Sequence, residues 1–144
     1  LRATIHFAES EMEIDEFLEA RDGIVAERGI VTGVSFDVPA ADEFRFRKVS
    51  RVKPKGVSVL SIAAVIKGSG TVESVGIGLG AMADRPMRAK AAEAALAGSD
   101  LSEEGIAEAV RVIGEATAPA TDPVASSWYR AEVLPVHFRR LMLD

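Results

Sequence analysis

A run of basic side chains with no intervening acid is the part of this sequence that most suggests a binding site. Six bases lie between residues 45 and 55, although the 144-residue chain has a formal net charge of −5. Segregated like charge costs self-repulsion, which an anionic ligand or the acidic face of a partner protein would offset. Charge runs of this kind are also common as simple solvation, and the residues alone leave both interpretations open. The six bases are Arg45, Arg47, Lys48, Arg51, Lys53 and Lys55.

The first of these bases alternate with Phe44 and Phe46, which is typical of a strand with two different faces. Adjacent residues of a strand point to opposite faces, so Arg47 and Lys48 cannot both serve one ligand. Arg45 shares a face with Arg47, whereas Lys48 shares the other face with Phe46. We therefore expect Arg45 and Arg47 to be the more natural anion clamp.

Three alternating glycines, Gly76, Gly78 and Gly80, suggest a dinucleotide-binding fingerprint at first sight. That fingerprint needs its glycines at a strand-to-helix turn, with the helix starting at once. Here the glycines alternate with Ile77 and Leu79 inside an apparent strand. A strand face without side chains instead favours close approach of another element.

Residues for nucleophilic catalysis are present, but they are not arranged in a recognisable motif. Ser126, His137 and Asp144 are the residue types of a hydrolytic triad, yet neither serine nearby has the flanking glycines of a nucleophile elbow. His6 alternates with the apolar residues Ile5 and Phe7, which predicts a strand and favours a structural role. The acids of residues 9–19 have no fixed pairing and are interpreted as a solvated face.

Composition excludes several other classes of function. Apolar residues make up 48% and charged residues 27% of the chain, as in an ordinary globular domain. The absence of cysteine rules out thiolate ligation of an iron–sulfur cluster and a cysteine nucleophile by these residues, and it suits a cytoplasmic protein. The negative net charge argues against non-specific nucleic-acid binding. The longest mainly apolar stretch, residues 57–66, is shorter than the about 20 residues of a membrane span. Because the chain begins at Leu1, we expect a fragment or a processed product.

The elements that would position these residues divide into two regions. Residues 1–40 carry nine acids and three arginines, and a short linker at residues 39–43 separates them from the basic run. Residues 34–38 alternate apolar and polar side chains up to Pro39, which predicts a strand. Residues 57–66 predict a central strand, and a turn at residues 67–70 returns the chain into a second strand, which makes a hairpin.

Everything after Gly80 has a helical pattern, so strands precede helices and the fold class is α+β. Trp128 and Tyr129 follow the last helix cap, where amphipathic rings usually anchor a helix by packing. On that basis Tyr129→Ala is expected to cost about 2–4 kcal/mol. The expected helix starts and stops are Asp84 with Pro86 and Gly98, then residues 100–103, then Ser126 or Ser127.

Taken in order, several segments resemble one family, the C-terminal domain of the FAD-binding subunit of molybdenum hydroxylases of the xanthine dehydrogenase and carbon monoxide dehydrogenase type. The resemblance covers residues 44–144. More weakly, IDEFL at 14–18 and the stretch from GIVT at 29–32 to Pro39 are similar to the end of the preceding FAD-binding domain. The main segments are FRKVSR at 46–51, IGLGAMADRPMRA at 77–89, EAALAG at 93–98 and DPVASSWYR at 122–130.

The resemblance implies a small antiparallel sheet of about three strands packed on a three-helix bundle. It divides the chain into residues 1–40, the partial tail of the FAD-binding domain, and residues 41–144, the C-terminal domain. In such enzymes electrons pass from a molybdopterin centre through two-iron two-sulfur (2Fe–2S) clusters to FAD. The implied partners are therefore the FAD-binding domain, a molybdopterin-binding large subunit and an iron–sulfur small subunit, with no nucleic acid and no membrane.

On this resemblance the chain is a fragment of an FAD-dependent oxidoreductase that covers the flavin and docks partner subunits, without being catalytic alone. Arg45, Arg47 and Lys48 are the residues expected near the FAD edge, with residues 52–56 as a gate. The chain lacks phosphate-cradling glycine loops, so we expect it not to retain FAD by itself. The alternative is a stand-alone, non-catalytic module of the same fold that binds a partner protein through its basic loop.

Overall fold

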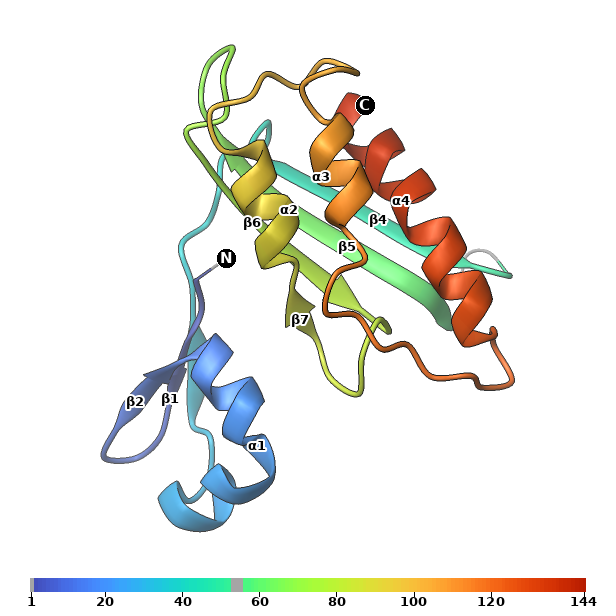
Figure 1. Cartoon of the computed structure of the whole chain (residues 1–144). Helices are drawn as coiled ribbons and strands as arrows, with labels where there is room; N and C mark the ends of the chain where they lie inside the picture. The colour runs from blue at the N-terminus through green and yellow to red at the C-terminus, as the bar shows by residue number, and fades with distance from the viewer. Residues whose placement is uncertain (1, 53–55) are drawn as a thin grey trace. The chain divides into compact units, whose positions relative to one another are not determined.

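The chain forms two compact units, residues 1–39 and residues 40–144, in a computed structural model that describes residues 2–52 and 56–144 (Figure 1). Lys53 and Lys55 of the basic run, and most of the expected gate, lie outside the described residues. Each unit has its own buried apolar cluster. The two units are therefore described separately.

The N-terminal unit is a three-stranded antiparallel sheet with one helix. Strands β1 (Thr4–His6), β2 (Glu11–Glu13) and β3 (Gly33–Ser35) lie in the order β2-β1-β3, and helix α1 (Ile14–Arg28) follows β2 directly. The strand expected at His6 is confirmed as β1. The strand expected over residues 34–38 is shorter than predicted, because β3 ends at Ser35, where its pairing with β1 ends at Thr4. The buried residues of this unit are Ile5, Phe7, Met12 and Ile24.

The C-terminal unit is built on a four-stranded antiparallel sheet in the order β4-β5-β6-β7. The predicted hairpin is confirmed, with β5 pairing antiparallel to β6 from Ser61–Gly80 to Lys67–Ser74. The sheet has one strand more than the about three that were expected, because residues 87–88 return beside β6 rather than entering a helix. The strands are β4 (Phe44–Ser50), β5 (Ser58–Lys67), β6 (Ser74–Gly80) and β7 (Met87–Arg88).

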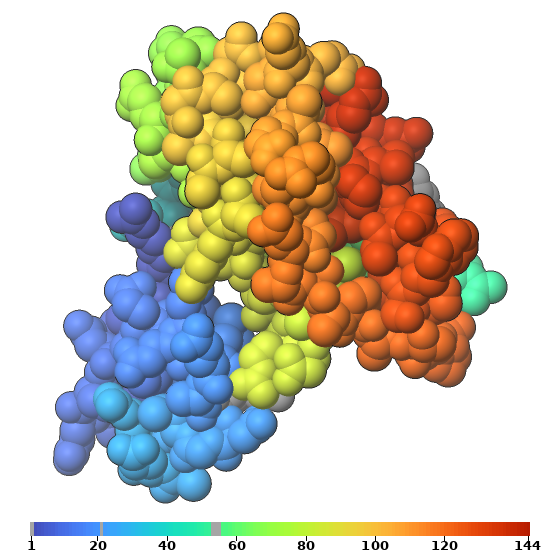
Figure 2. Space-filling view, viewed as in Figure 1, coloured from blue at the N-terminus to red at the C-terminus, as the bar shows by residue number. Residues whose placement is uncertain are grey.

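Three helices cover one face of this sheet: α2 (Lys90–Leu96), α3 (Ala107–Val112) and α4 (Ser127–Leu143) (Figure 1). Helix α3 contacts both α2 and α4, and the atoms of the three segments form a continuous cover in Figure 2. The predicted cap of the last helix is confirmed, because the Ser126 hydroxyl accepts a hydrogen bond from the Tyr129 N–H at 3.1 Å. The α+β fold class predicted from the sequence is thus confirmed.

Two predicted helix starts are wrong, and side-chain hydrogen bonds explain both. Helix α2 begins at Lys90 rather than near Pro86, because β7 intervenes and the Glu93 carboxylate then accepts the Ile77 N–H at 2.8 Å, where strand pairing ends. The Asp100 carboxylate accepts the Ser102 N–H at 3.1 Å and so closes a turn rather than capping a helix. Helix α3 starts only at Ala107.

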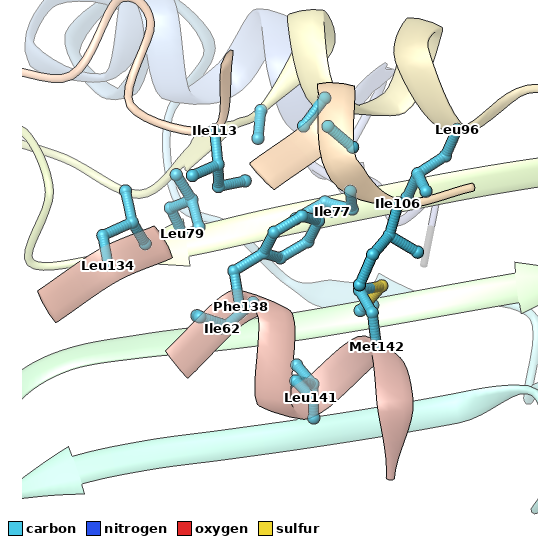
Figure 3. Close-up of a cluster of buried hydrophobic side chains, with 14 of the residues drawn as sticks. Ile62, Ile77, Leu79, Leu96, Ile106, Ile113, Leu134, Phe138, Leu141 and Met142 are labelled. Carbon is cyan, nitrogen blue, oxygen red and sulfur yellow. The ribbon is translucent and has the colours of Figure 1, made fainter. Parts of the chain in front are cut away.

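The main core lies between the helices and the facing side of the sheet (Figure 3). Alternate residues of the strands supply one wall, so Ile62, Ile77 and Leu79 are at most 1% exposed. Phe138 of α4 is fully buried against them. The helices supply the other wall through Leu96, Ile106, Ile113, Leu134 and Met142.

The predicted burial of the aromatic pair at the start of α4 is wrong. Trp128 is 70% exposed and Tyr129 is 43% exposed, whereas the next residue, Arg130, is 2% exposed. The helix therefore turns its arginine inward and its rings outward. Tyr129 is only partly buried, so the expected large cost of Tyr129→Ala loses its basis.

The buried Arg130 guanidinium joins α4 to the sheet and to the preceding loop. Its Nε donates to the Val59 carbonyl at 2.8 Å, and Nη2 donates to the Asp122 carboxylate at 2.8 Å. Nη1 donates to the carbonyls of Ala120 and Ala125. One side chain thus satisfies three backbone acceptors that would otherwise lose their partner.

We predict that Arg130→Met lowers the free energy of unfolding by about 3 kcal/mol, because buried acceptors are left without a donor. Urea denaturation of the purified chain measures the change. Arg139→Met on the same helix is the matched control, because Arg139 forms only an exposed pair with Glu103 and should cost less than about 1 kcal/mol. Equal losses in the two variants would contradict the role assigned to Arg130.

Candidate functional site: strand β4 and the open face of its sheet

Strand β4 carries its side chains on two faces with different surroundings. Arg45 lies opposite Ala64 and Arg47 opposite Ile62, on the face that the helices cover. Phe46 and Lys48 belong to the other face, which the register assigns to the same side as Gly78 and Gly80 of β6. The predicted separation of Arg45 and Arg47 from Lys48 is confirmed.

Arg45 binds the C-terminal end of α4. Its Nη1 donates to the Leu141 carbonyl at 3.0 Å and to the Met142 carbonyl at 2.5 Å. The last carbonyls of a helix have no partner within the helix and carry partial negative charge, so a cation is favourable there. Arg45 therefore stabilises the attachment of α4 to β4.

Arg47 donates to the carboxylate of Asp144 just beyond the same helix end. Its guanidinium also lies near enough to His137 to act on that ring electrostatically. The two predicted clamp residues thus share a face as expected, and in this structure both are engaged by the end of α4. Their contact with an anionic ligand stays a prediction.

Lys48 is exposed on the opposite face, beside an unusual aromatic pair. The rings of Phe44 and Phe46 are stacked nearly parallel, with centroids 6.5 Å apart and planes 7° apart. Phe44 is 40% exposed and Phe46 is 57% exposed. Strand β4 therefore presents two rings and one ammonium group on the face away from the helices.

The three alternating glycines of β6 lie on this same face, in register with the residues of β4 and β5. The predicted close packing holds only at Gly80, where an added Cβ would collide with Ser61 Oγ. At Gly76 an added Cβ would meet nothing within 4 Å, and at Gly78 only the Ala63 carbonyl at 4.0 Å. Glycine inside a strand destabilises it by about 0.5–1 kcal/mol relative to alanine. Nothing within this unit requires glycine at Gly76 or Gly78, because alanine would fit at both positions.

The residues of the supposed hydrolytic triad are not brought together. Ser126 caps α4, and His137 lies 11 residues further along the same helix, which is roughly 16 Å away at 1.5 Å per residue. Asp144 pairs with Arg47. Burial lowers the pKa of His137 below its usual range, and the positive charges of Arg47 and Arg140 lower it further.

Small hollows are present, but neither suits a dinucleotide. One of about 150 Å³ opens at the β5–β6 hairpin beside Leu101. One of about 370 Å³ lies in the N-terminal unit, where Glu9 and Glu27 outnumber the single base Arg28, so the lining does not favour a pyrophosphate. Within residues 2–52 and 56–144, no cluster of three metal-ligating side chains forms and no helix is long and apolar enough to cross a membrane.

The chain belongs to the CO dehydrogenase flavoprotein C-terminal domain family, whose model matches residues 45–144. The family resemblance found in the sequence is thus confirmed. A curated relative, the glyceraldehyde dehydrogenase medium chain of Sulfolobus acidocaldarius, is 29% identical over 103 residues. That alignment covers 69% of this chain and 36% of the relative, so the chain spans about a third of it.

Solved structures of similar fold include quinoline 2-oxidoreductase from Pseudomonas putida 86, with a TM-score of 0.77 and 22% identity. CO dehydrogenase from Oligotropha carboxidovorans gives a TM-score of 0.74, also at 22% identity. These alignments cover 99% and 98% of this chain, but only 52% and 51% of the solved chains. The likeness shows the fold and shows that this chain spans about half their length.

The two faces of β4 predict different effects on stability. Arg45→Ala should lower the free energy of unfolding by about 1–2 kcal/mol, because the last carbonyls of α4 lose their donor. Lys48→Ala should change it by less than about 0.5 kcal/mol, because Lys48 is exposed on the other face. Chemical denaturation of both variants checks the difference, and a larger loss for Lys48→Ala would contradict the assignment.

The surroundings of His137 predict loss of stability in mild acid. The unfolded chain takes up a proton on this ring near pH of about 6.5, whereas the folded chain resists it because the pKa is lowered. The stability that comes from keeping the His137 ring neutral is therefore fully present above the pKa of the unfolded chain. It is lost as the pH falls toward the lowered pKa of the folded chain. Melting temperatures between about pH 7.5 and pH 5.5 should decrease less for His137→Gln than for the unchanged chain. Arg47→Ala should also reduce the decrease, since it removes one of the positive charges, and an unchanged slope in both variants would contradict this.

Proposed function

We propose that this chain is the C-terminal part of the flavin subunit of a molybdenum hydroxylase, a xanthine dehydrogenase-like oxidoreductase. The observation that carries the proposal is the family match over residues 45–144, together with a fold likeness that extends over 98–99% of the chain. In this proposal residues 1–40 are the tail of the FAD-binding domain and residues 41–144 belong to the C-terminal domain. The division of the chain at residue 39 supports that boundary.

The cofactors belong mainly to other parts of the enzyme. FAD would bind in the complete subunit, while molybdopterin and the 2Fe–2S clusters would lie on partner subunits, which is consistent with the absence of cysteine here. Neither of the two hollows described above combines the size and the positive charge that a whole flavin dinucleotide needs, so this chain is proposed to meet only the edge of the flavin. The proposed partners are therefore the FAD-binding domain, the molybdopterin-binding large subunit and the iron–sulfur small subunit, in the cytoplasm.

The proposed role of this chain is to cover the flavin and to dock partners, not to perform a catalytic step. Among the residues proposed near the FAD edge, Lys48 is exposed and outside the contacts with α4. An ammonium group there can donate to an anionic oxygen of a flavin or its pyrophosphate. Arg45 and Arg47 would reach FAD only if their contacts with α4 were exchanged for contacts with the ligand.

The substrate of the whole enzyme is set outside this region. The similar proteins act, by their names, on glyceraldehyde, quinoline and carbon monoxide, although they share this fold. Function is determined by a site rather than by a fold. The proposal accordingly assigns electron transfer through FAD to this subunit and leaves the choice and oxidation of the substrate to the molybdopterin-binding partner.

Flavin content tests this proposal directly. The complete gene product that contains these residues should purify with FAD, whereas the 144-residue chain alone should be colourless. In the complete subunit, Lys48→Ala should weaken FAD binding by about tenfold, because one charge-assisted hydrogen bond is lost. Lys90→Ala is the matched control, since Lys90 is an exposed base at the start of α2 on the side of the helices.

Three results would count against the proposal. Stoichiometric FAD on the 144-residue chain would show that it holds the cofactor alone. A colourless complete product with no FAD-binding region would favour a stand-alone binding module. Unchanged FAD binding, subunit association and acceptor reduction in Lys48→Ala and in an Arg45→Ala, Arg47→Ala pair would make residues 45–51 a solvated charge run.

A further inference from the structure

On the face of the β4–β7 sheet away from the helices, large projecting side chains lie beside very small ones, as on a packing surface. Phe44 and Phe46 form a ridge along β4, and the cross-strand partners of Phe46 are the small residues Ala63 and Gly78. In the same way, Phe44 pairs with Val65 of β5, which in turn pairs with Gly76 of β6. We call the strip over Gly76 and Gly78 the glycine trough.

The trough is not explained by the packing of residues 40–144. An added Cβ would have space at both glycines, and neither has a positive φ angle that would require glycine. Glycine in a strand weakens it unless something approaches the backbone closely. The space above Gly76 and Gly78 is therefore suited to an element outside this unit.

The charges around the face restrict the partner. The paired residues on this face carry three bases, Lys48 and Lys67 at the ends of the strands and Arg88 on β7, and no carboxylate. Arg88 pairs with Glu93, whereas both lysines are exposed. A surface with an apolar centre and an acidic rim would complement this face.

We propose that this open face is where the FAD-binding half of the flavin subunit packs, with an apolar side chain of that half entering the glycine trough and an acidic residue meeting Lys67, while Lys48 is left to the flavin. This inference rests on the proposed function. The solved proteins of the same fold are about twice as long as the part that this chain covers, so a flavin subunit has another half available to cover the face. Burying Phe44 and Phe46 there would remove the exposed rings of β4 from water.

Cysteine labelling tests the proposal cleanly, because the 144 residues contain no cysteine. Ala63→Cys places a small thiol in the middle of the open face, and its reaction with a maleimide is followed by peptide mass spectrometry. The thiol should react in the 144-residue chain and should react at least about tenfold more slowly in the complete, FAD-containing subunit. Gly114→Cys is the control and should react in both, because Gly114 is an exposed turn residue just beyond α3, on the side of the helices.

A second substitution tests the trough itself. Gly78→Leu added to Ala63→Cys should restore labelling in the complete subunit, whereas Gly114→Leu should not. Equal labelling of Ala63→Cys in the chain and in the yellow complete subunit would overturn the packing proposal while leaving the proposed function standing. Protection in the 144-residue chain alone that increases with its concentration would overturn it in favour of a second copy. A complete product without FAD would instead count against the proposed function, because flavin absorbance is measured before labelling.

Discussion

The alternation of side chains along strands β4, β5 and β6 is the constraint on which the rest of this structure depends. One set of alternate residues, including Ile62 and Ile77, enters the core beneath the helices. The other set, including Phe46 and Gly78, faces away from them. Because a strand has a period of two, no base of β4 can be moved between these environments without shifting the whole register. The groups that each base can contact therefore depend on which of the two alternating faces of the strand it occupies.

Helix α4 then determines which bases remain available. Its C-terminal carbonyls face β4 and engage Arg45, while Asp144 beyond them engages Arg47. At its other end, Arg130 donates to the Val59 carbonyl at the start of strand β5. A basic run that looks uniform in the sequence thus contains arginines that hold a helix and a lysine that does not. The planar guanidinium suits such multiple backbone contacts better than an ammonium group.

The sequence was sufficient to predict the parts of the fold that depend on local signals. The β5–β6 hairpin follows from apolar strands around a glycine turn, and the start of α4 follows from the Ser126 cap. Strand β7 could not be predicted, because two residues have no period and gain their strand character only from pairing with β6. The exposure of Trp128 could not be predicted from the local sequence either. Hydrogen bonds from Arg130 to residues far away in the chain determine which side of the helix faces the core. In the candidate site, the faces of Arg45, Arg47 and Lys48 were predictable, but the acceptors that occupy the arginines were not.

The two faces of the sheet have different consequences for stability and for binding. The helix-covered face contains a continuous core with Phe138 and Leu60 fully buried, so folding does not require anything on the other side. The open face keeps glycine at two positions where alanine would fit, and it keeps exposed rings beside them. A surface selected only for solubility would replace both features, because glycine weakens the strand and exposed rings favour association. Their joint presence on one face is what the proposed contact with the FAD-binding half would explain, and the exposed lysines on that face give the contact an electrostatic preference for an acidic counterpart.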